Sequence, residues 1–267
     1  MRIALGPYVG DWKQEIFTFR PYMRWITNTV SHKDVFISAH SNRFFLYDWI
    51  PEDHKIPIYE DLTRNEFDQV GYIHLNLSKR DYTLLQKTFK AKVAEKDDLE
   101  NFFLVYNSST MWYPLYSKVF EKINVIEQLD LEDEYIVFIP DITESQDFLM
   151  SIYNSLKEEY NVVVIGDMKT HLSDLNVILK NPDYFEKSYE YIIEYISKAR
   201  AVICPTSHWT LLCNLQKVPV FSWTANTKQY VFGGLTLENR HCCSVIGNDK
   251  SMIVSSFRNF VEKLRRK

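Results

Sequence analysis

Glycine is scarce in this chain, with seven residues in 267. The chain contains neither of two glycine-rich nucleotide-binding motifs, the phosphate loop GxxxxGK[ST] and the dinucleotide fingerprint GxGxxG. Where glycine is this rare, each one is expected to mark a backbone shape that a side chain would prevent. Gly6 and Gly10 form such a spaced pair directly after an apolar N-terminal run.

Several other features are missing, and each absence excludes a class of protein. No apolar run approaches the length needed to cross a membrane, and residues 1–5 are too short for a signal peptide. The net charge of −4 disfavours a protein whose main role is to coat nucleic acid, although a local basic patch is still possible. A GxSxG elbow is also absent, so the neighbours Ser207 and His208 do not make a hydrolase pair.

The four cysteines follow no metal-binding pattern, because the chain has no CxxC motif. Two of them, Cys242 and Cys243, are adjacent and follow His241, but neighbouring cysteines chelate one zinc ion poorly. We therefore expect no metal, and the chain resembles a reduced, cytoplasmic protein.

Short apolar runs alternate with segments of helical periodicity along the chain. This alternation predicts an α/β fold with parallel sheets covered on both faces. The strands are expected at 2–5, 34–38, 55–59, 72–77, 102–106, 135–139, 161–165, 201–204 and 219–223. The helices are expected at 12–30, with a kink or restart at Pro21, and at 145–160, 184–200 and 209–216. A polar helical stretch is expected through Tyr82, Leu85 and Phe89, followed by a loop at 90–100.

An acidic cluster at 130–134 separates two such series and marks a domain boundary. We predict two Rossmann-like domains, 1–130 and 131–250, that face each other across a cleft. The amphipathic segment 251–267 is expected to form a helix that crosses back to the first domain.

The stretch 201–220 carries the strongest functional signal. A buried strand ends at Pro205, and Thr206 or Ser207 can cap the helix that follows. Backbone N–H groups and the hydroxyls of Thr206, Ser207 and Thr210 would then face the carboxyl end of the sheet, with His208 in the same turn. Such a turn suits a phosphate or diphosphate, and the alternative is an ordinary turn with a helix cap.

Other candidate residues also follow predicted strands. Gly166 and Asp167 line a nucleoside pocket or only make a turn, and Lys228 is a candidate phosphate contact. Gly10 and Asp11 end the loop after the first strand, where Asp11 is either a general base or a helix cap.

The helix after this loop carries further candidates. Glu15 lies one turn beyond Asp11 and is a second catalytic candidate. Arg20 and Arg24, one helical turn apart, bind an anionic group or are solvated.

These elements together resemble a GT-B fold glycosyltransferase of the heptosyltransferase-like branch. That family begins with a strand, a Gly-Asp turn and a helix containing a proline, which correspond here to Gly10, Asp11 and Pro21. Alignment of its C-terminal motif on 218–220 places Ser207 at the family's hydroxyl residue and Leu211 at the family's histidine.

The resemblance implies an inverting, metal-independent transfer of a sugar from a nucleotide-diphosphate donor to an acceptor hydroxyl, with Asp11 as the base. No cofactor other than this donor is implied. The donor's base would lie near Gly166 and Asp167, and its diphosphate near Thr206, Ser207 and Thr210.

The acceptor is either a glycan or metabolite, or a hydroxymethylated base in viral DNA. The composition, rich in Asn, Lys, Ile and Tyr and poor in Gly, suits the AT-rich genomes of many phages, which would place the protein in the host cytoplasm. A DNA acceptor would need a basic rim, for which the candidates are Arg20, Arg24, Arg43, Lys79 and Arg80.

Two alternatives remain open from the sequence. The missing histidine suggests a GT-B-like nucleotide-binding or assembly protein that has lost catalysis. A nucleotide-sugar epimerase-like enzyme would also use paired Rossmann-like halves.

Overall fold

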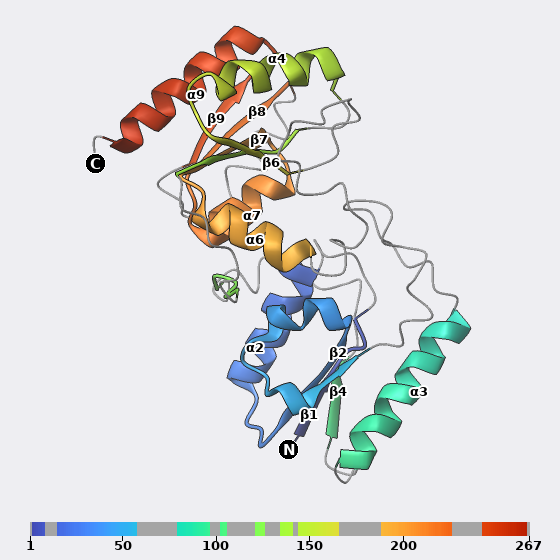
Figure 1. The fold of residues 1–267 in the computed structure, drawn as a ribbon. Helices are drawn as coiled ribbons and strands as arrows, with labels where there is room; N and C mark the ends of the chain where they lie inside the picture. The colour runs from blue at the N-terminus through green and yellow to red at the C-terminus, as the bar shows by residue number, and fades with distance from the viewer. Residues whose placement is uncertain are drawn as a thin grey trace. The chain divides into compact units, whose positions relative to one another are not determined.

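The computed structural model describes nine stretches of the chain, and their side chains with a few exceptions. They are residues 2–8, 15–57, 79–96, 102–105, 121–125, 134–140, 144–165, 188–225 and 242–265. The chain divides into two compact units, Met1–Asn124 and Val125–Lys267, each built on its own parallel sheet (Figure 1). The boundary predicted at residue 130 falls in a segment outside the described residues.

The first unit contains a parallel sheet in the order β3-β2-β1-β4. Its strands are β1 (Arg2–Leu5), β2 (Val35–Ala39), β3 (Lys55–Pro57) and β4 (Phe102–Val105). The chain moves from β1 outward to β3 and then returns to the other side of β1. The strand order therefore reverses between β1 and β4. All four strands were predicted, and the further strand predicted at 72–77 lies outside the described residues.

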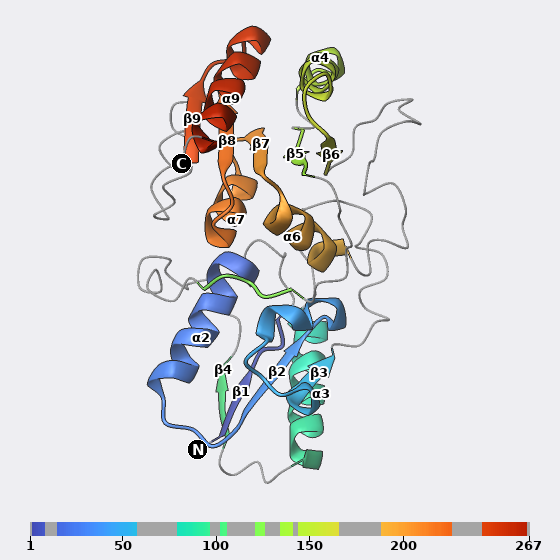
Figure 2. The same ribbon diagram turned by 60° about the vertical axis from the view of Figure 1, so that its left-hand side comes forward.

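Helices cover both faces of this sheet, with α2 and α3 on opposite sides (Figures 1 and 2). A short π-helix, η1 (Glu15–Phe19), leads directly into α2 (Arg20–Thr29). Pro21 lies in the first turn of α2, where its missing N–H leaves no hydrogen bond unmade. The predicted restart at Pro21 is thus confirmed.

The helix α3 (Lys79–Lys96) extends beyond its predicted end. The loop predicted at 90–100 is wrong for residues 90–96, because Phe89 and Val93 lie one turn apart and bury their side chains together against the sheet. The lysine, alanine and glutamate residues around them are good helix formers.

The second unit contains a five-stranded parallel sheet in the order β6-β5-β7-β8-β9. Its strands are β5 (Ile136–Phe138), β6 (Val162–Val164), β7 (Ala201–Pro205), β8 (Val220–Thr224) and β9 (Cys242–Ile246). The strand order reverses between β5 and β7. Strand β9 was not predicted, because as an edge strand it is only half-buried and has no continuous apolar run.

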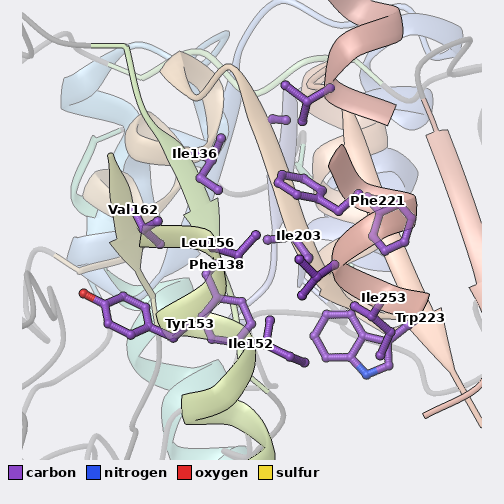
Figure 3. Close-up of a cluster of buried hydrophobic side chains, with 14 of the residues drawn as sticks. Ile136, Phe138, Ile152, Tyr153, Leu156, Val162, Ile203, Phe221, Trp223 and Ile253 are labelled. Atoms are coloured by element: carbon purple, nitrogen blue, oxygen red, sulfur yellow. The ribbon is translucent and has the colours of Figure 1, made fainter. Parts of the chain in front are cut away.

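Among the residues that the structure describes, four helices form the outer layers of this unit (Figures 1 and 2). They are α4 (Gln146–Lys157) and α9 (Lys250–Arg265) on one face, and α6 (Ser188–Lys198) and α7 (His208–Gln216) on the other. The core under α4 and α9 is apolar and aromatic, as Figure 3 shows for Ile152, Leu156, Ile203, Phe221, Trp223 and Ile253.

The helix predicted at 251–267 is present as α9, and it buries its apolar stripe in the core of the second unit, where Phe257 contacts Phe221 and Tyr160. Its crossing to the first domain stays a prediction. That stripe consists of Ile253, Val254, Phe257, Phe260 and Val261. Within the described part of the chain, no helix combines the length and apolarity needed to cross a membrane.

Candidate functional site

Open α/β sheets bind ligands at the carboxyl ends of their strands, where the strand order reverses. In the first unit this point lies between β1 and β4, and the segment containing Gly10 and Asp11 follows β1. In the second unit it lies between β5 and β7, and Thr206 and Ser207 follow β7. In both units, therefore, candidate residues from the sequence follow a strand beside the reversal.

Five of the candidate residues lie outside the described residues: Gly10, Asp11, Gly166, Asp167 and Lys228. The side chain of His208 also lies outside them.

The turn between β7 and α7 is closed by reciprocal hydrogen bonds. Ser207 caps α7, its hydroxyl oxygen accepting from the N–H of Trp209 at 3.3 Å. The Thr210 hydroxyl accepts from the N–H of Ser207 at 3.3 Å and donates to the carbonyl of Pro205 at 3.5 Å. The helix-cap interpretation is confirmed. The predicted ligand contact of Thr210 is corrected, because its side chain is fully buried within the cap.

A chain of three buried or half-buried hydroxyls lies beneath this turn. Thr206 donates to Ser222 at 3.2 Å, and the hydroxyls of Ser222 and Ser244 lie 2.6 Å apart. These three residues, which we call the hydroxyl chain, connect the carboxyl end of β7 to the middle of β8 and of β9. The Thr206 hydroxyl is thus directed to the sheet, which corrects its predicted contact with a ligand. The sequence signal for Ser222, which was missed, is a lone serine within the apolar run of β8.

The cysteines near this turn are free thiols. Burial raises the pKa of Cys204 to about 12 and the pKa of Cys213 well above its ordinary value. Both side chains are therefore neutral and inert at neutral pH. Among the residues that the structure describes, no group of three His, Cys, Asp or Glu side chains could hold a metal ion.

The first unit has a charged cluster where its helices meet the sheet. Glu15 is fully buried, and its Oε2 accepts from Nη1 of Arg43 at 2.7 Å. Its Oε1 accepts from the hydroxyl of Tyr47 at 2.7 Å. Burial, followed by the neighbouring Glu15, raises the pKa of Tyr47 well above its ordinary value, so the phenol remains protonated. We call these three residues the carboxylate cluster.

This arrangement corrects the catalytic role predicted for Glu15. Both carboxylate oxygens accept hydrogen bonds inside the unit, and the residue has no exposed surface from which to take a substrate proton.

His40 follows β2 at its carboxyl end and is also buried. Burial, and to a smaller degree the positive charge of Arg43, lowers the pKa of His40 to about 3. Its ring is thus neutral at physiological pH. No periodic pattern in the sequence indicates a role for this residue.

Arg20 has an internal structural role, which corrects both of its predicted roles. Its Nε donates to the carbonyl of Leu46 at 2.7 Å and its Nη1 to the carbonyl of Glu121 at 3.0 Å. Only 3% of the residue is exposed, and burial lowers its pKa. It is therefore neither solvated nor open to an anionic ligand.

Arg24 remains nearer the surface. Its Nε forms an ion pair with Glu121 at 3.0 Å, and its guanidinium lies 4.8 Å from the centre of the Trp49 ring. Because Arg20 and Arg43 are both buried, two of the residues proposed for a DNA-facing basic rim cannot serve there. The side chains of Lys79 and Arg80 are outside the described ones.

Comparisons with known proteins identify the fold. No protein-family model and no curated protein matches the sequence. Among solved structures, the chain is similar to E. coli heptosyltransferase WaaC with ADP, with a TM-score of 0.52 and 12% identity over 99% of this chain and 100% of that one. It also matches E. coli ADP-heptose lps heptosyltransferase II, with a TM-score of 0.49 and 11% identity over 99% of both chains.

The likeness to WaaC spans nearly the whole of both chains, so it concerns both units. At 12% identity it is a likeness of fold. The α/β architecture expected from the sequence agrees with it.

Proposed function

We propose that this protein is a glycosyltransferase that moves a sugar from a nucleotide-diphosphate sugar to an acceptor hydroxyl. The observation that carries the proposal is the capped turn after β7, which follows a strand beside the reversal point of a sheet whose fold resembles that of a heptosyltransferase. The solved structure of that heptosyltransferase contains ADP.

The proposed diphosphate site is the start of α7. The N-terminus of a helix carries partial positive charge and suits an anion. Ser207 is half-buried and is the only hydroxyl of the turn with appreciable exposure among Thr206, Ser207 and Thr210. The backbone around Ser207 and His208 would bind the diphosphate, with Lys228 as a further contact and Gly166 and Asp167 beside the nucleoside.

The proposed base is Asp11. Its carboxylate would take the proton of the acceptor hydroxyl while that oxygen attacks the anomeric carbon. The bond from the anomeric carbon to the diphosphate oxygen breaks in the same step, so the sugar configuration inverts. Negative charge that develops on the leaving diphosphate would be stabilised by the start of α7, without a metal.

The acceptor proposed here is a glycan or small metabolite. Two observations favour it over modified DNA: the net charge is −4, and Arg20 and Arg43 are buried. DNA binding requires several accessible cations along the phosphate backbone.

The decisive variant is Asp11→Asn. We expect transfer to fall by about 10²- to 10⁴-fold, the range typical of a lost general base, with donor affinity unchanged by calorimetry. The control is Asp34→Asn, because Asp34 pairs with Arg2 near the opposite, amino end of β1. Full turnover by Asp11→Asn would exclude Asp11 from this role.

A protein that binds nucleotide without turnover is the second candidate. Leu211, which takes the position of the family's histidine, is buried and apolar and can make no polar contact with a ligand. Titration with a panel of nucleotide sugars, together with an assay for transfer, distinguishes the two. Binding without transfer favours the second candidate, and conversion of the donor without any acceptor would indicate an epimerase-like enzyme.

A further inference from the structure

The helix α3 concentrates positive charge in a chain whose net charge is −4. Its 18 residues include six basic side chains and two acidic ones. The basic residues are Lys79, Arg80, Lys87, Lys90, Lys92 and Lys96, and the acidic ones are Asp81 and Glu95. A basic amphipathic helix is typical of segments that bind either a membrane surface or the groove of a partner protein.

The apolar face of α3 is already used inside the first unit. Phe89 and Val93 are buried in one cluster with three residues of the sheet, Ala4, Phe36 and Ile56. This face is therefore not available to insert into a bilayer or into the groove of a partner. Any contact that α3 makes outside the unit has to use the opposite face.

The opposite face of α3 consists of five exposed residues at helical spacing. We call it the lysine face, and its members are Thr83, Lys87, Lys90, Ala91 and Ala94. Since the other three side chains are short, the two lysine ammonium groups project furthest from the helix. Neither Lys87 nor Lys90 has an ion pair with another side chain among the described residues. Of the elements described in the first unit, α3 is the outermost on its side of the sheet (Figures 1 and 2).

The two lysines act together because they lie close to each other. Residues three apart on a helix have their Cβ atoms about 5–6 Å apart, which is less than the Debye length of about 8 Å at physiological salt. Like charges at this spacing repel each other and destabilise the helix slightly. An anionic surface offsets this repulsion and attracts both ammonium groups at once.

The chemistry of the lysine face favours lipid headgroups over nucleic acid. Lysine is a compact point charge that needs no fixed geometry, which suits a mobile layer of headgroups, whereas arginine suits bidentate phosphate contacts. The four arginines of the first unit whose side chains are described each bind a group within the unit, and they are Arg2, Arg20, Arg24 and Arg43. A duplex would require several accessible cations along its phosphate backbone.

We propose that the lysine face docks on the surface of an anionic lipid bilayer and is held there by charge. The inference is independent of the proposed function, because it requires neither a sugar donor nor a catalytic base. Each lysine close to an anionic leaflet contributes about fivefold in affinity. Because no apolar side chain inserts, binding should weaken steeply as salt is added.

The test is sedimentation of the full chain with two kinds of vesicle. One contains phosphatidylcholine with about one third phosphatidylserine, and the other contains phosphatidylcholine alone. We expect the wild type to bind the first and not the second, and to dissociate from the first at high salt.

The decisive variant is the double substitution Lys87→Gln with Lys90→Gln. Both positions are exposed and glutamine is a good helix former, so the fold should be retained. Affinity for the phosphatidylserine vesicles should fall about 25-fold. The matched control is Lys33→Gln with Lys122→Gln, which removes the same charge from exposed positions of the same unit and should change affinity by less than about twofold.

A third variant should have the opposite effect. Glu95 is exposed near the end of α3, and its charge opposes binding to an anionic surface. Glu95→Gln should therefore raise affinity for the phosphatidylserine vesicles by about fivefold. A gain of binding does not arise from partial unfolding of α3 in a variant whose melting temperature is unchanged.

Four results would overturn the inference. These are no binding of the wild type to the phosphatidylserine vesicles at low salt, equal binding to both kinds of vesicle, an equal loss in the two double variants, and no gain in Glu95→Gln. Duplex DNA is titrated in the same buffer. Tighter binding to DNA than to the vesicles, lost in the Lys87 and Lys90 variant, would overturn the assignment to lipid and give the face to nucleic acid.

Discussion

The carboxyl edges of the two sheets are stabilised by different chemistry. In the first unit, a buried carboxylate is held by a guanidinium and a phenol, with a neutral histidine nearby. In the second unit, three neutral hydroxyls connect neighbouring strands. Burial of an ion pair costs desolvation free energy, and removal of one partner costs still more stability because it leaves an unpaired buried charge. Hydrogen bonds between neutral hydroxyls contribute less to stability, and these hydroxyls do not titrate.

This difference suits the role that we propose for each edge. A base requires a fixed position, and buried charge-assisted hydrogen bonds fix nearby chain more firmly than neutral ones. A diphosphate site requires that no fixed negative charge compete with the ligand. The hydroxyl chain orders the turn after β7 without placing a carboxylate beside the start of α7.

The largest effect is expected from Arg43→Met. This change leaves Glu15 as an unpaired buried carboxylate, and breaking a buried pair in this way costs about 3–5 kcal/mol of stability. The control is Arg200→Met in the second unit, whose partner Glu134 is largely exposed. It should cost no more than about 1 kcal/mol.

Hydrogen exchange of peptides from each unit, measured across a urea series, gives the two stabilities separately. Equal losses of stability in Arg43→Met and Arg200→Met would show that the first unit does not depend on its buried ion pair.

Low pH should destabilise the first unit, because His40 takes up a proton more readily in the unfolded chain than in the folded one. Its folded-state pKa of about 3 lies below the value of 6.5 for an exposed histidine, so between these values the unfolded chain binds a proton and the folded chain does not. Stability therefore falls as pH decreases through this window, by about 3 kcal/mol between pH 7 and pH 4.

The comparison for this prediction is His40→Gln, which removes the titrating group. The difference in stability between wild type and His40→Gln should change with pH from 7 to 4 and be constant above pH 7.5. A difference that is constant over the whole range would mean that His40 does not contribute to acid sensitivity.

The sequence predicted the elements that depend on local patterns. Buried parallel strands are short apolar runs, which is why β1, β5 and β7 were found near their observed bounds. The cap at Ser207 and the restart at Pro21 also follow from residue type and position alone.

What the sequence missed depends on contacts between residues far apart in the chain. Glu15 and Arg43 are distant in sequence, and nothing in either local pattern indicates that they form a pair. The same holds for the burial of Arg20, whose partners include the distant Glu121. Periodicity places a residue on a face, but it does not identify the neighbour that satisfies its charge.

The smallest effect is expected in the second unit, from Ser222→Ala. The variant leaves the Thr206 hydroxyl without its acceptor and removes the partner of Ser244, so it should cost about 1–3 kcal/mol. Ser255→Ala on α9, which loses an exposed hydroxyl bonded to the carbonyl of Met252, is the control and should be nearly neutral. The loss in Ser222→Ala should have the same size at pH 5 and pH 8, because none of the three hydroxyls titrates in that range. Urea unfolding of the wild type and the variant at both pH values measures this loss. A loss of stability in Ser222→Ala that varied with pH would mean that a charged group also stabilises the second sheet here. The two sheets would then both depend on charged groups, to different extents.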